Sequence, residues 1–495
     1  MNIASNLKNS AFYFPDRCAV IEDNEIITFA QFNQDTNRVA SALVGRGVRA
    51  GDHVALCAPN SYHWLAFYFG VLKTGAVAVT FSHLLMKNEV VKILKDCMPK
   101  VLFTTDEKRD NLNGVKIGPY PELTICKHGD ISFLGLTAEG RSEFKIVDRD
   151  RLDTAAILYT GGTTGIPKGA MLSHENIQTS TFNVAHYERS AETDRALCFL
   201  PLNHVFGQIH ITHSTVSSAG GLIIQQAFDL EKAVDAIERH QITKFFAVPT
   251  IYIRLLALKD LSKKFESVRY CFSAAASMAS EVVREWKART GLDIHESYGM
   301  TESAAMVTFN HYYRHVVGSV GTPIDLVEVQ IRDSEGTNLE PGEAGEICIQ
   351  GPNITKGYLN NPEETKAAFW GKWYRSGDIG YFDEDSYLYI VDRLKDMIIT
   401  GGENVYPREV EEILYTRSEI QECAVVGLPD TEYGERVTAF IIPHKDQQPD
   451  FNDLKAYLKK HLAGFKVPKE FIIVDELPKN PAGKLLKREI KKQYS

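Results

Sequence analysis

A glycine- and threonine-rich segment carries the strongest chemical signal in the chain. It has the sequence YTGGTTGIPKGA at 159–170 and follows a run of small and apolar residues at 154–158. Backbone N–H groups, threonine hydroxyls and one lysine in such a loop can converge on phosphate oxygens. The pattern is not G-x-x-x-x-G-K-[ST], which disfavours an ordinary P-loop nucleotide site. Because the segment ends in Pro-Lys-Gly, a purely structural glycine loop is also disfavoured, and we predict a phosphate-binding loop.

Six further motifs follow along the chain. They are FLPLNHVFG (199–207), ESYGMTE (296–302), YRSGDIG (374–380), DRLKDMI (392–398), GGENVYP (401–407) and PKNPAGK (478–484). With the phosphate loop, their order and spacing resemble the adenylate-forming (ANL) superfamily, which includes acyl-CoA and aryl-CoA synthetases, peptide-synthetase adenylation domains and beetle luciferases. The resemblance covers essentially the whole chain. It implies an acyl-CoA synthetase, an AMP-forming acid–thiol ligase that makes an acyl-adenylate from a carboxylic acid and ATP and passes the acyl group to coenzyme A.

The chemistry of this reaction explains which side chains it needs. A carboxylic acid with a pKa of roughly 4–5 is already ionised at neutral pH, so its attack on phosphorus requires no general base. The obstacles are repulsion between that anion and the ATP phosphates and the charge that builds on the α-phosphate. Catalysis should therefore consist of positioning and electrostatic stabilisation.

The resemblance implies an ATP site assembled from several motifs. Residues from Thr160 to Lys168 would hold the β- and γ-phosphates, and Thr301 would reach the α-phosphate. Glu302 would hold Mg²⁺, with Thr160 as a second ligand, as suits a hard cation that shares protein oxygens with phosphate. The complete set of ATP-binding residues that it implies is Thr160, Gly161, Gly162, Thr163, Thr164, Gly165, Lys168, Ala275, Ser297, Tyr298, Gly299, Thr301, Asp378, Arg393 and Lys484.

Three residues of this set would bind the nucleoside. Tyr298 would stack on adenine, and Asp378 would accept hydrogen bonds from the two ribose hydroxyls. A carboxylate that accepts from a vicinal diol has a parallel in dinucleotide sites. Arg393 would add a second contact to the ribose.

The resemblance also implies two arrangements of a mobile C-terminal domain. Lys484 would bridge the substrate carboxylate and the α-phosphate, then leave so that a thiol can reach the acyl carbonyl. The domain would rotate about Lys395 and bring Gly401, Gly402 and Glu403 to line a tunnel for the thiol arm. Glycine suits that position because a pantetheine arm must pass close to the backbone. The implied catalytic residues are therefore Lys484, Glu302, Thr301 and the hinge residue Lys395.

The acyl pocket is predicted to be apolar. Amino-acid-activating members of the superfamily carry an Asp where this chain has Val205, so an α-amino acid substrate is disfavoured. Ala275 stands where the superfamily often has a glycine-rich turn, and its methyl group would narrow the channel. We predict a fatty or other hydrophobic acid, with an aryl acid as the alternative. The pocket residues are predicted to be His204, Val205, Phe206, Ile251, Ala275 and Met300.

The histidines His204, His210 and His213 form a cluster in the sequence. A metal site is disfavoured because neither Cys nor an acidic residue joins them. We expect core or pocket histidines with satisfied hydrogen bonds, with His204 as a gate or pocket residue.

The fold is predicted from three regions of the chain that differ in their pattern of strands, helices and turns. Strand-like runs such as 53–59, 242–249 and 268–276 alternate with amphipathic helical stretches, which is typical of layered α/β architecture. From about 318 to 392, short strands with Gly and Pro turns indicate a compact β-barrel subdomain. We predict a large N-terminal α/β domain over 1–394 and a small α+β domain over 395–495, with the hinge at Lys395.

Composition limits the choice of partners and compartment. A net charge of -9 disfavours nucleic acid as the main partner. The sequence contains neither a signal-like N-terminus nor an apolar run long enough to span a bilayer, so we expect no integral membrane protein. Eight scattered cysteines favour a reducing, cytoplasmic setting.

Three alternatives remain open from sequence. The first hands the acyl group to the phosphopantetheine of an acyl carrier protein instead of coenzyme A. The second is a catalytically inactive binding or scaffold protein, which retention of Glu302, Asp378, Arg393 and Lys484 disfavours. The third is luciferase-type oxidation. ATP, Mg²⁺ and coenzyme A, or a carrier phosphopantetheine, are the expected cofactors and co-substrates.

Overall fold

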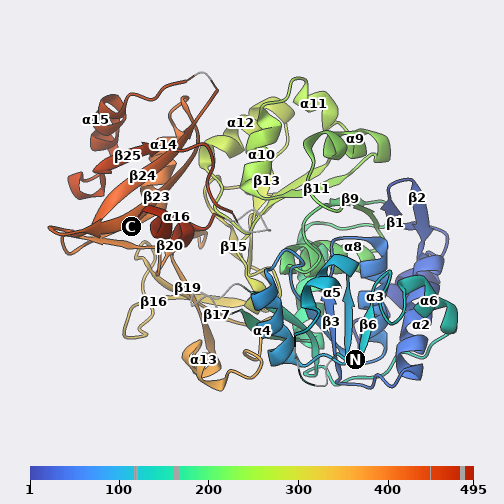
Figure 1. The fold of residues 1–495 in the computed structure, drawn as a ribbon. Helices are drawn as coiled ribbons and strands as arrows, with labels where there is room; N and C mark the ends of the chain where they lie inside the picture. The colour runs from blue at the N-terminus through green and yellow to red at the C-terminus, as the bar shows by residue number, and fades with distance from the viewer. Residues whose placement is uncertain (116–117, 119–120, 161–166, 446, 480–484, 495) are drawn as a thin grey trace.

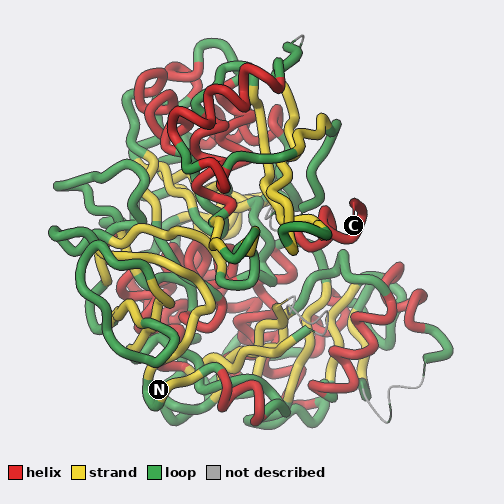
Figure 2. Tube along the Cα trace, turned by 90° about the vertical axis from the view of Figure 1, so that its left-hand side faces the viewer, coloured by secondary structure: helices red, strands yellow, loops and turns green. Residues whose placement is uncertain are grey.

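The computed structural model describes residues 1–495 apart from 116–117, 119–120, 161–166, 446, 480–484 and 495. A large N-terminal region of α/β layers leads into a β-rich segment and then into a small C-terminal α+β domain (Figure 1). Figure 2 shows the same layers from the side. This arrangement confirms the predicted fold class.

The first sheet presents the predicted phosphate loop. It has six strands in the order β6-β5-β3-β4-β7-β8, parallel except for the last pair. Most of its parallel strands are buried, as expected where helices cover a parallel sheet. The strands are β3 (His53–Cys57), β4 (Val77–Thr80), β5 (Val101–Thr104), β6 (Leu123–Ile125), β7 (Thr154–Thr160) and β8 (Lys168–Ser173).

The second sheet presents two other motifs. It has seven strands in the order β13-β12-β11-β9-β10-β1-β2, parallel except for the edge strand β2. Ala275 and Tyr298 follow the carboxyl ends of neighbouring strands β12 and β13, the edge at which open α/β sheets place ligands. The strands are β1 (Cys18–Glu22), β2 (Glu25–Thr28), β9 (Arg195–Cys198), β10 (Gly221–Ile224), β11 (Lys244–Ala247), β12 (Tyr270–Ser273) and β13 (Ile294–Glu296).

Helices flank both sheets, and local capping sets several of their ends. Helix α3 begins directly after Ser61, because the Ser61 hydroxyl accepts from the Trp64 N–H and caps the helix. Helix α12 ends at Gly291, whose φ of 77° provides the left-handed C-cap expected of glycine. The helices are α1 (Ser5–Tyr13), α2 (Phe29–Gly45), α3 (Tyr62–Lys73), α4 (Lys87–Cys97), α5 (Asp106–Leu112), α6 (Phe133–Glu139), α7 (His174–Tyr187), α8 (Ser214–Ser217), α9 (Leu230–His240), α10 (Pro249–Leu256), α11 (Leu261–Lys264) and α12 (Ser280–Thr290). A π-helix (η1, Phe206–His213) precedes α8.

The β-rich segment forms a five-stranded antiparallel sheet and a two-stranded ladder. In this sheet β18 and β20 both pair with β19, and β16 pairs with β17 at the opposite edge. The elements are η2 (Thr301–Ser303), β14 (Thr308–Phe309), β15 (Thr322–Pro323), β16 (Glu328–Arg332), β17 (Gly345–Gln350), α13 (Pro362–Ala367), β18 (Phe369–Trp370), β19 (Trp373–Phe382) and β20 (Leu388–Arg393).

The C-terminal domain packs around its own hydrophobic core, which contains Ile398, Val410, Val425 and Leu454 among others. The domain combines helices with strands, in agreement with the predicted α+β character. The elements are β21 (Ile398–Thr400), β22 (Glu403–Val405), α14 (Pro407–Tyr415), β23 (Ile420–Asp430), β24 (Gly434–Pro443), α15 (Phe451–His461), η3 (Gly464–Lys466), β25 (Glu470–Ile473) and α16 (Lys487–Tyr494).

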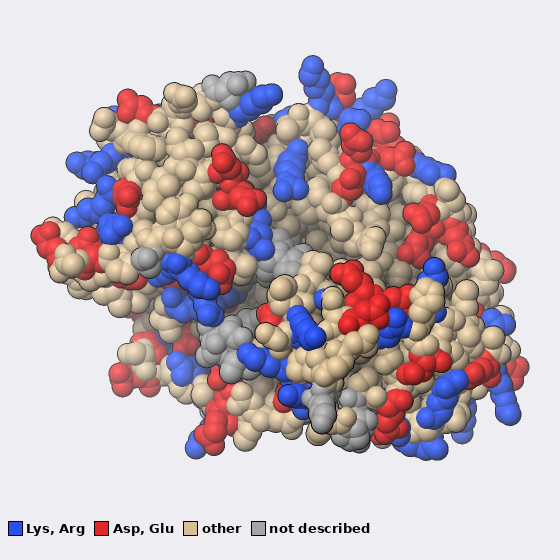
Figure 3. Space-filling view, viewed as in Figure 1, with Lys and Arg blue, Asp and Glu red and all other residues tan. Residues whose placement is uncertain are grey.

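Two surface properties bear on function. Within the described ranges, none of the helices combines the length and apolar character needed to cross a membrane. Basic and acidic side chains are interspersed over the face seen in Figure 3.

Candidate active site

The predicted phosphate loop connects strands β7 and β8, whose register pairs Thr160 with Lys168. Five predicted phosphate-binding residues (Gly161, Gly162, Thr163, Thr164 and Gly165) lie outside the described residues. The Lys168 ammonium forms an ion pair with the Glu364 carboxylate of α13. The antiparallel pair therefore holds both described ends of the loop next to one another, with a cation at one of them.

A tyrosine that sequence reasoning missed connects this loop to Glu302. The Tyr358 hydroxyl donates to Glu302 Oε1 at 2.8 Å and lies 3.2 Å from the Tyr374 hydroxyl. The Lys168 ammonium lies 5.7 Å from the centre of the Tyr358 ring. Burial, followed by the charge of Glu302, raises the pKa of Tyr358, which keeps the phenol protonated and able to donate. Tyr358 thus orients the carboxylate predicted to hold Mg²⁺.

The three residues predicted to bind the nucleoside lie together. The Tyr298 hydroxyl donates to Asp378 Oδ2 at 2.7 Å, and Arg393 Nε lies 3.2 Å from Asp378 Oδ1. Antiparallel pairing of β19 with β20 places Asp378 directly opposite Arg393. Burial and then the charge of Asp378 raise the pKa of Tyr298 well above its usual value. This cluster presents an aromatic ring, a carboxylate and a guanidinium within hydrogen-bonding reach of one another.

The backbone around Tyr298 is tightly folded. A side chain at Gly299 would place its Cβ 1.5 Å from the carbonyl oxygen of Ala305, so only glycine fits. The Ser297 hydroxyl donates to the Thr308 carbonyl at 2.7 Å. Thr301 is buried where η2 begins. These contacts explain the residue types at Gly299 and Ser297, two of the predicted ATP-binding positions.

Three of the predicted acyl pocket residues, His204, Val205 and Phe206, lie at or next to the start of η1. Val205 and Phe206 are buried there, and the Phe206 ring packs 5.6 Å from that of Phe272. His204 Nδ1 accepts the Phe206 N–H at 3.2 Å, which leaves the other ring nitrogen to carry the proton.

Three further pocket predictions come from other segments. Ile251 is buried in α10, and Met300 is partly buried against the same core. Ala275 has φ 72°, a conformation that favours glycine, so its methyl group is held there at a cost in strain.

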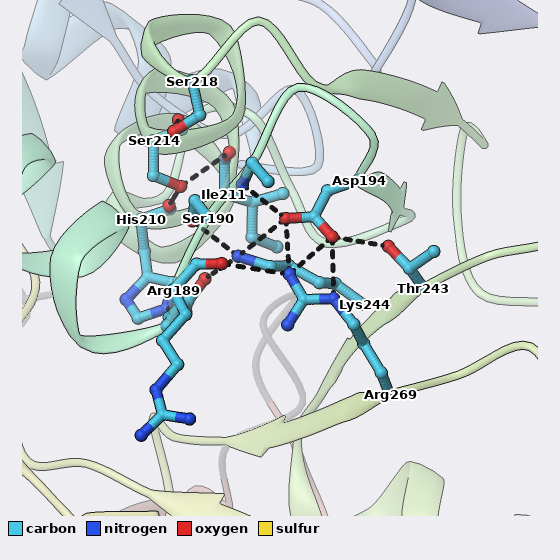
Figure 4. Close-up of polar contacts among 12 residues, drawn as sticks. Arg189, Ser190, Asp194, His210, Ile211, Ser214, Ser218, Thr243, Lys244 and Arg269 are labelled. Atoms are coloured by element: carbon cyan, nitrogen blue, oxygen red, sulfur yellow. Dashed lines mark hydrogen bonds and ion pairs between the residues drawn. The ribbon is translucent and has the colours of Figure 1, made fainter.

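A buried ionic network includes His210, whose ring packs against that of Phe206 with 5.2 Å between the ring centres, and Figure 4 shows His210 with Asp194, Lys244 and Arg269. His210 Nε2 lies 2.6 Å from Glu188 Oε1, and Lys244 Nζ lies 3.1 Å from Glu188 Oε2. The network also includes Asp194, whose Oδ1 lies 2.6 Å from Arg269 Nη2. Although burial raises it, the charges of Lys244 and His210 hold the pKa of Glu188 below its usual value. Glu188 and Asp194 lie outside every predicted motif, so the sequence offered no signal for their pairing.

Two of the three histidines, His210 and His213, have hydrogen-bonding partners, although the buried Nδ1 of His213 has none among the described residues. His210 is bonded to Glu188, and His213 Nε2 lies 2.9 Å from the Tyr68 hydroxyl. Both rings are buried, and burial lowers the pKa of His213 to about 3. Across the part of the chain that the structure describes, no cluster of three or more His, Cys, Asp or Glu side chains is arranged to hold a metal ion.

The hinge region is described on both sides of Lys395. Burial and then the charge of Arg393 lower the pKa of Lys395. Beyond it, the predicted thiol-tunnel residues Gly401, Gly402 and Glu403 are exposed. The two glycines have φ of 60° and 86°, which suits their residue type.

Contacts across the hinge and around the predicted catalytic loop are also defined. The Arg408 N–H donates to Asp392 Oδ2 at 2.9 Å and connects α14 to β20. Lys484 lies outside the described residues. On either side of its loop, Lys479 and Lys487 form ion pairs with Glu422 and Glu411, at 2.7 and 2.8 Å.

Comparison with known families identifies the class. Residues 7–359 match the AMP-binding enzyme family, and residues 409–484 match the AMP-binding enzyme C-terminal domain. The chain therefore belongs to the AMP-binding enzyme family, which confirms the resemblance predicted from its motifs.

Individual relatives extend over nearly the whole chain. It is 33% identical to a long-chain-fatty-acid–CoA ligase of Bacillus subtilis (strain 168), covering 99% of this chain and 94% of the relative. It is 34% identical to a feruloyl-CoA synthase of Amycolatopsis sp, covering 97% and 96%. These matches confirm the predicted class, an enzyme that ligates an acid to a thiol with formation of AMP.

Solved structures agree. ATP-bound MatB from Rhodopseudomonas palustris superposes with a TM-score of 0.92 at 34% identity, over 100% of this chain and 99% of that one. The anthranilate CoA ligase AuaEII in complex with anthranoyl-AMP gives 0.95 at 28% identity, over 100% and 97%.

Proposed function

We propose that this chain activates a hydrophobic carboxylic acid with ATP and transfers the acyl group to coenzyme A. The observation that supports this most directly is the cluster of Tyr298, Asp378 and Arg393, held together by contacts of 2.7 and 3.2 Å. It offers a ring for a base and hydrogen-bonding groups for a ribose. Lys168 and Glu302 both contact Tyr358. The lysine offers a positive charge for phosphate, and the glutamate offers a negative charge for a metal ion.

The residues at Glu302 fit a magnesium ion. One carboxylate oxygen is oriented by the Tyr358 hydroxyl, which presents a hard oxygen donor in a fixed direction. Magnesium typically binds proteins through one or two carboxylates together with phosphate oxygens and water. Bound there, the ion would neutralise phosphate charge, with Thr160 as the second candidate ligand.

The remaining predicted residues would act in different half-reactions. Thr301 and Lys484 would stabilise charge at the α-phosphate while the acid attacks. Rotation about Lys395 would then replace Lys484 by Gly401, Gly402 and Glu403, which would line the path of the thiol. The boundary between the rotating parts would lie between residues 394 and 395.

We favour a fatty or other hydrophobic acid over an α-amino acid. The His210 ring packs against Phe206, and the buried carboxylate bonded to that histidine, Glu188, already pairs with Lys244 and is not free to receive a substrate ammonium. The long-chain relative from B. subtilis supports a fatty acid. An aryl acid is the second candidate, because Phe206 and Phe272 provide flat aromatic walls and one relative is a feruloyl-CoA synthase.

The acceptor and compartment complete the proposal. Coenzyme A is favoured because the relatives that cover the chain are CoA ligases. A carrier protein is the alternative acceptor, and a cytoplasmic location is proposed from the cysteine pattern.

The test is pyrophosphate release from ATP and Mg²⁺ with a panel of fatty, aryl and amino acids. Each acid is assayed alone, with coenzyme A, and with a holo carrier protein. Turnover with a hydrophobic acid that requires coenzyme A is the expected result. Pyrophosphate release with none of the acids would contradict the proposal and revive the scaffold alternative.

A further inference from the structure

The ammonium of Lys168 has a partner within the chain. Its Nζ contacts Glu364 Oε1, although the two residues lie 196 positions apart. The Lys168 side chain is 14% exposed and that of Glu364 is 40% exposed. A largely buried cation is thus compensated by a carboxylate that borders on water.

Local structure places Glu364 firmly. Helix α13 begins after Asn361, whose side chain accepts the Glu364 N–H at 3.2 Å. The next residue, Thr365, accepts the Tyr358 N–H at 2.9 Å. Since Tyr358 also contacts Lys168 and Glu302, the helix carrying Glu364 is attached to the centre of the predicted phosphate site.

The surroundings of Lys168 explain why it needs an anion. Lys395 lies near enough for Lys168 to contribute to the lowered pKa of Lys395. Arg393 contributes to that shift as well. Several cations therefore converge on one region, and a largely buried ammonium without a counter-charge would be costly.

We propose that Glu364 is a resident counter-ion that holds Lys168 between turnovers and competes with the phosphates of ATP and pyrophosphate for it. The inference rests on the proposed function. Glu364 is a positioning residue: it acts on nucleotide through Lys168. When ATP arrives, its phosphates take over the ammonium, and the Glu364 carboxylate turns into water at little desolvation cost because it is partly exposed. When pyrophosphate leaves, Glu364 takes the ammonium back.

This exchange acts on polyphosphate binding and not on the acid. Removing the Glu364 charge leaves Lys168 free for phosphate, so ATP and pyrophosphate should both bind more tightly. The size of the effect follows from a partly exposed ion pair, about two- to fivefold in affinity. The KM of the acid should stay unchanged.

The experiment compares Glu364→Gln with Glu363→Gln in the full-length enzyme. Glu363 is exposed and lies in the same first turn of α13, so its variant makes the same change of helix charge. The KM of ATP, the inhibition constant of pyrophosphate and the KM of the acid are measured. We expect the first two to fall about two- to fivefold in Glu364→Gln only. Glu364→Asp, with its shorter reach, should be intermediate and serves if the Gln variant fails to fold.

Two results would overturn the inference in an active enzyme. One is equal ATP and pyrophosphate constants in Glu364→Gln and Glu363→Gln, even if stability changes. The other is a rise in the KM of ATP, which would mean that Glu364 itself supports nucleotide binding. If the wild-type enzyme failed to release pyrophosphate with every acid tested, that result would instead contradict the proposed function, and the inference with it.

Discussion

Tyr298 donates a hydrogen bond from its hydroxyl to the carboxylate of Asp378, with 2.7 Å between the oxygens and 80 residues between them in the chain. Both side chains are buried, and Arg393 occupies the second carboxylate oxygen. The residue predicted to stack on adenine thus orients the residue predicted to bind the ribose.

Tyr298→Phe should weaken ATP binding while leaving the chemical step nearly intact. The ring remains for stacking, but Asp378 loses one charge-assisted hydrogen bond, worth about 1–2 kcal/mol. We expect the KM of ATP to rise about five- to thirtyfold with kcat within about twofold. The matched control is Tyr457→Phe, which removes an exposed tyrosine hydrogen bond from the C-terminal domain. Similar ATP constants in the two variants would contradict the nucleoside role of the Tyr298–Asp378 pair.

Lys484→Ala and Lys395→Pro should separate the two half-reactions. Without the Lys484 ammonium, adenylate formation should be abolished, whereas thioester formation from a supplied acyl-adenylate should persist. Proline at 395 fixes φ and should stop the rotation, which spares adenylation and blocks transfer. Pyrophosphate release and thioester formation are assayed separately. Equal loss of both steps in both variants would disprove the two-arrangement account.

Ala275→Gly should stabilise the protein and change its acid preference. The residue has φ 72°, where an alanine costs about 1 kcal/mol relative to glycine. Loss of the methyl group should also widen the predicted acyl channel and improve kcat/KM for bulkier acids. Thermal unfolding and an acid panel measure the two effects. Ala276→Gly, at an exposed neighbour outside the left-handed region, is the control and should not stabilise.

Lys244→Met should be strongly destabilising because it leaves Glu188 buried without its lysine partner. Breaking one partner of a buried pair typically costs about 3–5 kcal/mol. The control Lys264→Met removes a lysine that pairs with Glu238 at the surface and should cost at most about 1 kcal/mol. Urea unfolding compares the two. A loss for Lys244→Met no larger than that of the control would show that the network contributes little to stability.

Glu296→Gln should flatten the dependence of stability on pH. Burial raises the pKa of Glu296 to about 8, against 4.5 for the ordinary carboxyl. Between these values the unfolded chain releases a proton that the folded chain keeps, so folding stability is full below pH 4.5 and falls as the pH rises through 8. Glutamine does not titrate and lacks this loss.

The measurement is the unfolding free energy of both proteins from pH 5 to 9, taken as a difference. The difference is needed because Lys73, whose pKa is lowered to about 7 by burial, makes stability rise over part of the same range. Parallel curves for wild type and Glu296→Gln would show that Glu296 titrates normally.

The sequence by itself determined the local elements and the chemical groups. The helix at 280–290 ends where Gly291 takes up the left-handed conformation, because such a C-cap depends on the residue type at that one position. Tyr298, Asp378 and Arg393 were assigned to one site from motif order alone, and they do lie together.

Tertiary structure alone decided which distant groups meet. Tyr358 reaches Glu302, and Glu364 reaches Lys168, only because β8 pairs with the segment before α13, as the Ala170–Tyr358 bridge records. Glu188 and His210 pair across 22 residues through packing of α7 against η1. Such contacts depend on strand register and helix packing between remote segments, and a periodicity or a spacing within one segment carries no information about them.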